Sequence, residues 1–362
     1  MFIAMNKVIS IFLALTSLLC FWLSGIQSGR VVGLRADYRL NSALPIDNAP
    51  PLIAFTTVAL GGFSTLIADV LWFRVTALQE EGRYVELVQL SDWITKLEPR
   101  CGEIWAFHAW NMAYNVSVIM PYPEDRWRWV RKGIELLRDE GIRYNPGDQQ
   151  VYRELGWLFL NKVGGKTDET HQYYKDRWAE EMTALLGGGY PDYRKLEQQP
   201  VTVKRMAEEY KLRLEVMRRI DEEYGPLDWR LPQSHAVYWA VKGRDRCWDE
   251  KVLPCERMIL QAVKESFVRG RMIHGTDGRY HLVPATELFE KIMKAHDTAQ
   301  KKYPLETYFI HSKAGFMKDA VRVFNDAGRQ SEARALFNQL VSEIPESMKE
   351  RNFEVFINTG GK

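Results

Sequence analysis

Residues 80–99, "EEGRYVELVQLSDWITKLEP", carry the pattern that most constrains how this chain can fold. After Gly82, apolar residues recur three or four positions apart, as one face of a helix requires: Tyr84, Leu87, Leu90, Ile94 and Leu97. Gly82 predicts a tight turn between helices over 63–80 and 83–97, with Tyr84 packed back against the first helix. Pro99 blocks continuation of the second helix. Such a pair cannot bury both of its faces alone, so further copies are expected.

A copy lies near the C-terminus, in "FMKDAVRVFNDAGRQSEARALFNQLVSEIPE". Gly328 and Pro345 are separated by the same 17 positions as Gly82 and Pro99. Ala333 and Phe337 fill the packing positions after Gly328, whereas Leu87 and Ser91 stand at these positions in the first copy. The pattern resembles the tetratricopeptide repeat, a helix pair of about 34 residues. The resemblance implies repeats that begin near Ala68 and Ala314.

The rest of the body also has helical spacing. Pro146 ends a further unit, with helices expected over 102–116 and 124–140, and another helix begins near 149. "LPQSHAVYWAVKG" and "PCERMILQAVKESFVRG" predict one more pair, and "AEEYKLRLEVMRRIDEEYG" predicts a single helix that stops at a glycine. "RYHLVPAT" is the one short strand candidate. The predicted fold class is therefore all-α, a tetratricopeptide-like helical-repeat solenoid behind a transmembrane helix.

The predicted organisation has six parts. These are a membrane anchor (1–26), a linker (27–51), N-terminal helical repeats (52–163), an irregular insertion (164–205), C-terminal helical repeats (206–347) and a tail (348–362).

The first part contains a possible membrane span. Residues 8–26, "VISIFLALTSLLCFWLSGI", are uncharged and long enough to cross a bilayer as a helix. A cleaved signal peptide is the alternative, but a small-residue cleavage site fits poorly. The predicted location is a bacterial inner membrane with a single-pass anchor. The side of the body stays open: arginines after the span favour the cytoplasm, whereas a short tail before one span is typical of an exporting signal anchor, and we favour the periplasm. The apolar stretch 50–73 is read as a helix buried in protein or lying at the interface, with a second span as the alternative.

Charge and cysteine content exclude some functions. Residues 1–60 hold four of the 49 basic and two of the 47 acidic residues, which leaves 45 of each sign for the rest. A balanced body argues against nucleic acid as the main partner. Cys247 and Cys255 flank a short loop, so a disulfide between them is one reading and two thiols the other. No cysteine or histidine spacing suits zinc, no phosphate-loop or hydrolase motif is present, and no cofactor is expected.

Three clusters could carry chemistry, and each also has a structural reading. "HAWNMAYN" places His108 within a polar helical patch, which could be a ligand site or a buried network. "DRWRWVRKG" could bind anionic groups, or it could be a core stripe of Trp127 and Val130 with solvated arginines. Asp228, His235 and Tyr238 could do acid–base work, but no nucleophile accompanies them. We favour the structural reading of all three.

The resemblance to tetratricopeptide domains also implies a binding face, because the first helix of each repeat lines a concave groove for peptides in that family. The positions that would face it are Asp69, Thr76, Trp110, Tyr114, Arg153 and Trp157. Filling of the repeat core is the alternative role for the tryptophans.

The ordered run "LQEEGRYVELVQLSDWITKLEP … IWAFHAWNMAYN … PEDRWRWVRKGIELLRDEGIRYNP" also resembles bacterial membrane-anchored repeat proteins that have no established activity. The predicted function is a membrane-anchored scaffold for protein–protein interaction within an envelope or transport complex, and not an enzyme. The alternatives are a helical enzyme that uses His108 or His235, and a lipid-binding accessory protein.

Overall fold

The structure is a computed structural model that describes residues 63–246, 252–274, 280–348 and 350–359, with six isolated positions before residue 31. The chain divides into two units, Met1–Pro50 and Pro51–Lys362. The predicted anchor over 8–26 and the linker over 27–51 lie outside the described residues, apart from those isolated positions.

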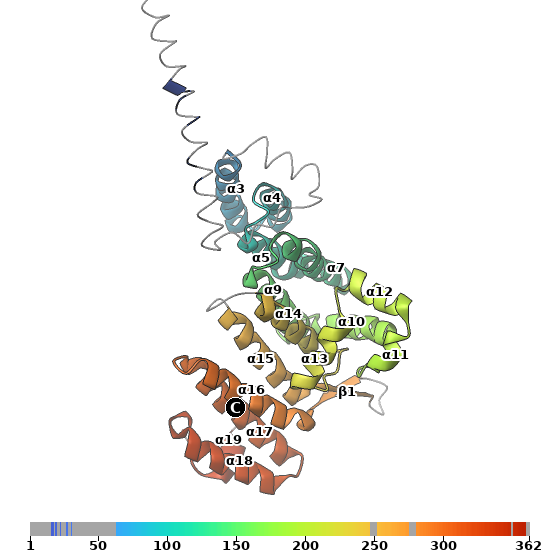
Figure 1. Ribbon diagram of the computed structural model, residues 1–362, viewed down its shortest axis with the longest axis vertical. Helices are drawn as coiled ribbons and strands as arrows, with labels where there is room; N and C mark the ends of the chain where they lie inside the picture. Colours follow the sequence, from blue (N-terminus) through green and yellow to red (C-terminus); the bar gives the residue numbers. More distant parts are fainter. Residues whose placement is uncertain are drawn as a thin grey trace, which may run out of the picture. The chain divides into compact units, whose positions relative to one another are not determined.

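The described part of the second unit is all-α, as predicted, with one small hairpin (Figure 1). The N-terminal helices are α3 (Phe63–Glu80), α4 (Tyr84–Leu97), α5 (Gly102–Trp110), α6 (Ser117–Ile119), α7 (Pro123–Glu135), α8 (Ile142–Tyr144) and α9 (Gln149–Trp157). The middle helices are α10 (His171–Leu186), α11 (Tyr193–Glu197), α12 (Pro200–Glu209), α13 (Leu214–Tyr224), α14 (Pro232–Arg246) and α15 (Leu253–Arg269). The hairpin pairs β1 (Arg271–His274) with β2 (Tyr280–Val283), and β2 lies within the predicted strand. The C-terminal helices are α16 (Phe289–Lys302), α17 (Thr307–Asp326), α18 (Gln330–Glu343) and α19 (Phe353–Thr359).

Three π-helical segments continue the long helices, and two short 3₁₀ turns complete the described elements. The π-helical segments are η2 (Asn111–Val116), η3 (Leu136–Gly141) and η4 (Leu158–Val163), and the 3₁₀ turns are η6 (Thr286–Leu288) and η7 (Pro345–Ser347).

The predicted glycine turns have the same geometry at both ends of the described region. Gly82 and Gly328 have φ of 70° and 76°, in the left-handed region that glycine adopts without a steric penalty. In each turn the next residue donates its N–H to a carbonyl five positions back: Arg83 to Leu78 at 2.9 Å and Arg329 to Phe324 at 2.8 Å. This hydrogen bond caps the first helix. Tyr84 packs back on the core of the pair, as predicted.

In four helix pairs the second helix has the same backbone arrangement at its C-terminal end. In each of them one residue separates the helix from a proline. The residue before the proline has φ between −124° and −134° and ψ between 57° and 65°. Its carbonyl accepts a hydrogen bond of 3.0–3.2 Å from the N–H three residues on. The prolines are Pro99, Pro146, Pro304 and Pro345. Sequence analysis identified all of these stops except Pro304. The short turn makes the following helix reverse direction at once.

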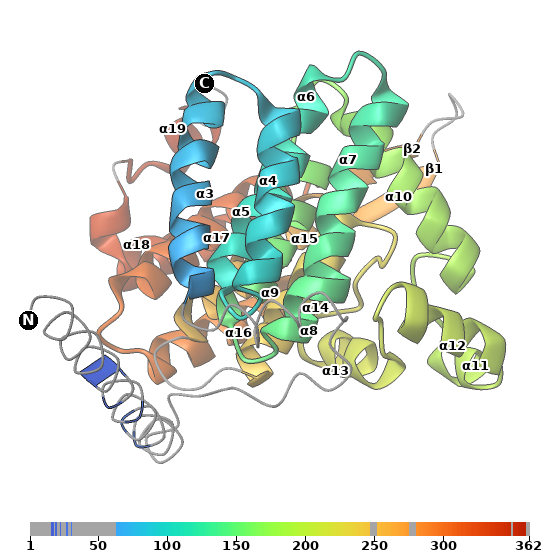
Figure 2. The same cartoon turned by 90° about the horizontal axis from the view of Figure 1, so that it is seen from above.

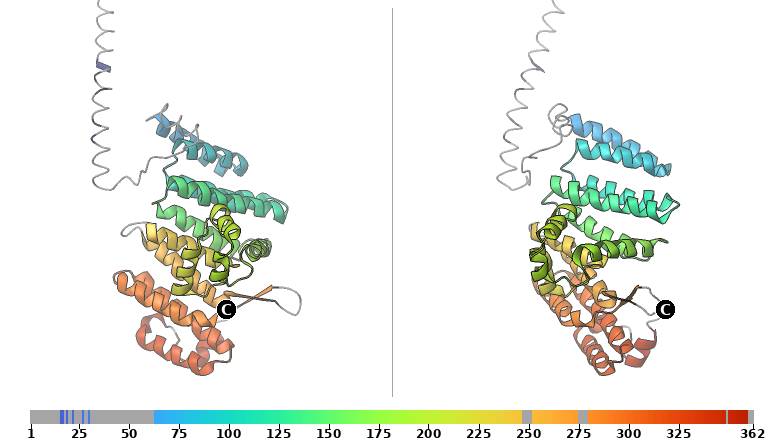
Figure 3. Two further views of the ribbon diagram at one scale, coloured as in Figure 1. Left: turned by 45° about the vertical axis from the view of Figure 1, so that its right-hand side comes forward. Right: turned by 90° about the vertical axis from the view of Figure 1, so that its right-hand side faces the viewer.

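The helix pairs pack in the order of the sequence (Figure 3). The first helices of the pairs form one row: Trp72 of α3 meets Phe107 of α5 edge to face, α9 contacts both α5 and α15, and α15 contacts α17. The second helices α4, α7, α14, α16 and α18 pair with them. Viewed from above, α3 and α4 run side by side (Figure 2). The predicted pair α14 and α15 is among the most extensive contacts.

Glycines bring α14 close to its neighbours. A Cβ on Gly243 would lie 2.7 Å from Cys255 Sγ and 2.8 Å from Tyr152 Cβ, so no larger residue fits there without movement. Gly156 of α9 likewise faces the backbone of Ala236 in α14. These two contacts run in opposite directions along the helices, which shows that α9 and α14 are antiparallel.

The structure differs from the sequence-based prediction in the middle of the chain. Residues 164–205, expected to be irregular, contain α10, α11 and most of α12. The single helix expected through Tyr210 is broken between α12 and α13, because buried Tyr238 binds the backbone there: its hydroxyl donates to Lys211 O at 2.7 Å and accepts from Arg213 N at 3.0 Å. The predicted tail contains α19, whose Phe356 packs on Phe337.

The predicted second apolar stretch, 50–73, is described only from Phe63 onward, where it forms part of α3. One face of α3 is buried in the first pair through Ala68 and Val75. Its opposite face is apolar and exposed. No helix within the described residues is both long enough and apolar enough to cross a bilayer.

The glycine turn gives a testable expectation. Gly328→Ala should lower the free energy of unfolding by about 1 kcal/mol, because a left-handed backbone costs an L-residue that much, and a Cβ there would touch nothing within 4 Å. Gly315→Ala within α17 is the matched control. Its Cβ would approach only Lys264 Nζ, at 4.0 Å, so removing a helical glycine should raise stability by up to about 1 kcal/mol. Urea unfolding of both variants measures the difference. A Gly328→Ala protein as stable as the wild type would contradict the turn.

Candidate functional site

Four of the six predicted binding residues come together on α5, η2 and α9. The indole of Trp110 stacks on Tyr114, with ring centroids 5.4 Å apart and an interplanar angle of 23°. Arg153 and Trp157 are four residues apart on α9, on one face. Trp110 is exposed, and Tyr114, Arg153 and Trp157 are half-buried. We call these four residues the aromatic surface.

Tyr114 joins the two helices of this surface. Its hydroxyl donates a hydrogen bond of 2.9 Å to Asn161 Oδ1, and the Lys162 ammonium lies 5.1 Å from its ring centroid. Burial and the Glu154 carboxylate raise the pKa of the Tyr114 phenol well above its ordinary value, against a hydrogen bond with the Trp157 indole. The phenol is therefore neutral at physiological pH. Tyr114 and Asn161 both lie in π-helical segments, which are frequent at functional sites.

A buried ion pair anchors the inserted segment beside this surface. Lys162 Nζ and Asp168 Oδ2 lie 2.5 Å apart, and both side chains are less than 5% exposed. Burial opposes ionisation of Asp168, but hydrogen bonds from Lys162 and Thr170 outweigh it and lower the pKa of Asp168 to about 2. Arg126 adds a weaker contact at 3.7 Å. The pair stays charged at neutral pH and fixes the start of the insertion to η4.

The other two predicted residues lie apart from this cluster. Asp69 and Thr76 are both exposed on α3, and Thr76 Oγ1 donates to Trp72 O within the same helix. The prominent feature of that helix is an exposed apolar face, within the stretch that the sequence analysis read as buried or lying at the membrane interface: Phe73 is 79% and Val70 67% exposed. The structure therefore brings together Trp110, Tyr114, Arg153 and Trp157 and leaves Asp69 and Thr76 separate.

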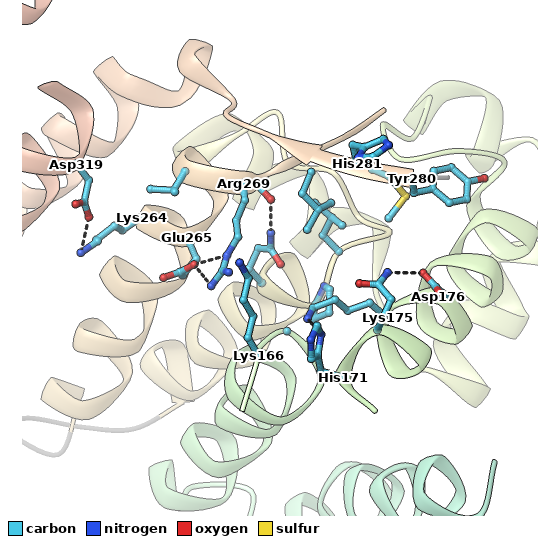
Figure 4. Close-up of a pocket in the computed structure, with 18 residues that line it drawn as sticks. Lys166, His171, Lys175, Asp176, Lys264, Glu265, Arg269, Tyr280, His281 and Asp319 are labelled. Atoms are coloured by element: carbon cyan, nitrogen blue, oxygen red, sulfur yellow. Dashed lines mark hydrogen bonds and ion pairs between the residues drawn. The ribbon is translucent and has the colours of Figure 1, made fainter. Parts of the chain in front are cut away.

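A cavity of about 610 Å³ opens farther along the row of first helices, against α15 (Figure 4). One wall is α10, and another is the hairpin, which is held by Asp228: its Oδ2 accepts from Met272 N at 3.2 Å. The lining combines apolar side chains such as Val268 and Leu282 with many charged ones. Its size is that of pockets that hold small molecules or peptide side chains.

Two of the four lysine and arginine side chains that line this cavity are paired with carboxylates, but Lys175 is not bonded to one. Lys264 lies 2.8 Å from Asp319, and Arg269 lies 2.6 Å from Glu265. The Lys175 ammonium instead donates to Gly165 O and lies 2.8 Å from His171 Nδ1, as Figure 4 shows for the two side chains. Burial, Arg269 and Lys166 lower the pKa of Lys175 to about 8. The cavity thus presents a partly neutralised amine to a ligand.

The two predicted catalytic histidines are both buried and lack a catalytic arrangement. Neither ring nitrogen of His108 has a hydrogen-bond partner. His235 Nε2 contacts Trp229 O at 2.9 Å, and its ring stacks on Phe159. Asp228 is bound by Arg230, and Tyr238 by the backbone described above, so the three residues Asp228, His235 and Tyr238 each bond to other groups. This arrangement gives no support to acid–base chemistry.

The segment "DRWRWVRKG" has the arrangement expected for a core stripe rather than for a binding site. Trp127 and Val130 are buried, and Trp127 stacks on Tyr174. Arg128 and Arg131 form ion pairs with Asp125 and Glu135. These arginines are therefore already neutralised.

The predicted disulfide is not tested, because Cys247 lies outside the described residues. Cys255 is buried in the first turn of α15, with its Sγ 3.9 Å from Gln149 O. Within the described ranges, no group of three or more His, Cys, Asp or Glu is placed to hold a metal ion.

Sequence reasoning missed the cavity because it treated residues 164–205 as irregular. The signal was present: Tyr174, Trp178, Met182 and Leu185 are spaced as one buried helix face. Residues 187–192 form the loop between α10 and α11. Lys175 and His171 line the cavity because of where α10 lies relative to α15. No local sequence pattern specifies that position.

No protein-family model, no curated protein and no solved structure matches this chain. The candidate site therefore has to be judged on its own geometry.

Buried histidines predict a pH dependence of stability. Burial lowers the pKa of His108, His235 and His296 from 6.5 to about 4. The unfolded chain takes up these protons near pH 6.5 and the folded chain only near 4, so the free energy of unfolding should fall as the pH drops through this window. At roughly 1.4 kcal/mol per pKa unit, each histidine contributes up to a few kcal/mol.

Urea unfolding at pH 7.5, 6 and 5 measures this effect. His296→Phe, in a site where the imidazole stacks on Phe316, should reduce the loss of stability on acidification. Asp297, Lys313 and Lys264 are the charged groups around His296 and remain in the variant. His311→Gln, at an exposed position of the next helix, α17, is the control and should keep the wild-type dependence. Equal slopes for all three proteins would contradict the assignment.

Proposed function

We propose that this protein is a membrane-anchored, tetratricopeptide-like helical-repeat scaffold that binds another protein through the aromatic surface. The anchor is residues 8–26, in a bacterial inner membrane, with the body on the periplasmic side. It restricts the body to the bilayer and thereby raises the effective concentration of membrane partners. No reaction is assigned to it.

The observation that carries this proposal is a set of aromatic and arginine side chains left accessible on the row of first helices. Tryptophan, tyrosine and arginine are the residues that most often dominate binding energy at protein interfaces. Here Trp110, Tyr114, Arg153 and Trp157 adjoin one another, and Tyr114 is fixed by its bond to Asn161. A rigid aromatic group loses little entropy on binding. The repeated Gly and Pro turns support the tetratricopeptide-like reading.

The partner should depend on the two tryptophans. Full-length tagged chain, purified in detergent, should retain a stoichiometric protein partner. Trp110→Ala and Trp157→Ala should each weaken its binding about 30-fold, the effect of a hot-spot residue worth about 2 kcal/mol. Trp93→Ala, at a position 66% exposed on α4, is the matched control and should leave affinity within twofold. Binding of the identified partner is measured by titration with purified components.

Two results would count against this function. One is an absence of any stoichiometric partner. The other is equal weakening by all three substitutions, since that would place the contact elsewhere. Circular dichroism melts confirm that each variant is folded. Arg153→Ala offers a further variant that preserves the aromatic rings.

A lipid-binding accessory role is the second candidate, and the exposed face of α3 favours it. Leu66, Val70 and Phe73 lie on one side of the helix, opposite the buried Ala68 and Val75. An amphipathic helix with such a face can lie in the membrane interface. The paired arginines of α7 lend no support to it. The enzyme alternative has the weaker basis, because His108 and His235 are buried within the helical core.

Export of the body is tested separately. A reporter enzyme that is active only outside the cytoplasm, fused after residue 362, should be active in the full-length fusion. Deletion of residues 1–30 should abolish this activity while the fusion protein is still made. An inactive full-length fusion, together with activity of a cytoplasm-dependent reporter at the same position, would place the body in the cytoplasm.

A further inference from the structure

A second surface recess has a charge that the composition of the body does not lead one to expect. The recess has a volume of about 310 Å³ and is lined by six basic side chains and one acidic one. The basic residues are Arg138, Arg143, Lys211, Arg213, Lys242 and Arg246, and the acidic residue is Asp139. Residues 61–362 as a whole carry equal numbers of each sign. We call this site the basic recess.

Three separate elements supply these cations. Arg138 and Arg143 come from η3 and α8, Lys242 from α14, and Lys211 from the break between α12 and α13. Convergence of like charges from three elements disfavours the folded state when the recess is empty. Packing of the helices does not by itself require this convergence of charges, because the buried residue that lines the recess, Trp239, is apolar and 1% exposed.

The segment that carries Lys211 and Arg213 has a strained backbone conformation. Lys211 has φ of 54°, and it is the one described non-glycine residue with positive φ. Buried Tyr238 maintains this arrangement through its two backbone hydrogen bonds. A lysine in the left-handed region is disfavoured relative to an ordinary backbone conformation. Such strain is concentrated at binding and catalytic sites.

Lys242 lines the recess and has no carboxylate partner among the described ion pairs. Its ammonium lies 4.7 Å from the ring centroid of Trp239 and 5.3 Å from that of Tyr238. Burial and the like charges of Arg246 and Arg213 lower the pKa of Lys242 to about 8. The neighbouring Arg138 is paired with Asp139 at 2.6 Å, and Arg213 lies 3.8 Å from Glu215. Basic side chains therefore outnumber acidic ones around Lys242.

We propose that the basic recess is a binding site for a phosphate-bearing ligand. Lysine and arginine clusters suit phosphate, whose several oxygens accept many donors at once. The volume equals that of about ten waters at roughly 30 Å³ each, which accommodates a phosphate group and a few attached atoms. Ile142, Ala207 and the edge of Trp239 provide apolar contact for those atoms. This site is independent of the aromatic surface and of the partner-binding function.

The experiment uses full-length chain in neutral detergent, with sodium pyrophosphate as the soluble probe and sodium chloride at matched ionic strength as the reference. Calorimetric titration should show saturable binding of one pyrophosphate. A second arm measures binding to phosphatidylcholine vesicles with and without phosphatidic acid. Binding of pyrophosphate points to a free phosphoanion, and binding to phosphatidic acid alone points to a lipid headgroup. Either result supports the site.

Lys242→Gln should weaken binding of the successful probe at least tenfold, and its thermal stability should match or exceed that of the wild type, because a like charge is removed. Arg246→Gln, at an exposed position, should also weaken binding. Lys204→Gln is the control with the same change of charge, on α12, where Lys204 pairs with Glu208. Absence of binding in both arms overturns the proposal. Equal weakening by Lys204→Gln and Lys242→Gln overturns it as well, since binding would then reflect net charge alone.

Discussion

Burial between neighbouring helix pairs is the constraint on which this fold depends. Within one pair, α3 and α4 cover only the surfaces that face each other, and the remaining apolar residues need the next pair. Helix α9 illustrates the consequence, because it contacts α5, α14 and α15 together. The gain comes from apolar area removed from water. Positions such as Gly156 and Gly243 contribute by allowing these helices to approach closely. Loss of one pair would therefore expose surface on both of its neighbours.

How much of this could be read from the sequence depends on whether the signal is local. Gly82, Gly328 and three of the four prolines mark turns because glycine and proline have intrinsic backbone preferences. Helices over 63–80, 102–116 and 330–343 follow from apolar spacing. The break at 210–213 could not be predicted, because Tyr238 lies 25 residues or more away in sequence from the atoms it binds.

The candidate sites divide in the same way. Trp110 and Tyr114 were predicted because they lie four apart on one helix at positions that the repeat pattern exposes. The cavity beside α15 and the basic recess each combine residues from three or more elements. Their charges belong to ordinary amphipathic helices when viewed singly. Only the placement of α10 across the cavity from α15, and the packing of the 210–213 segment on α14 through Tyr238, bring them together.

The connections between helices differ at the two edges of the row. In three of the connections from a second helix to the next first helix, after α4, α8 and α16, the chain repeats one short proline turn. From first helix to second helix, the connection ranges from a single glycine turn after α3 to the whole segment 164–231 after η4, with the hairpin after α15. Because the pairs are antiparallel, the long excursions emerge at one edge, while the proline turns hold a constant register at the other. At one edge the short turns fix the spacing of the helix pairs. At the other edge the connecting segments vary in length and can be lengthened or replaced. Evolutionary divergence, and grafting of new loops by design, would meet least resistance at the second.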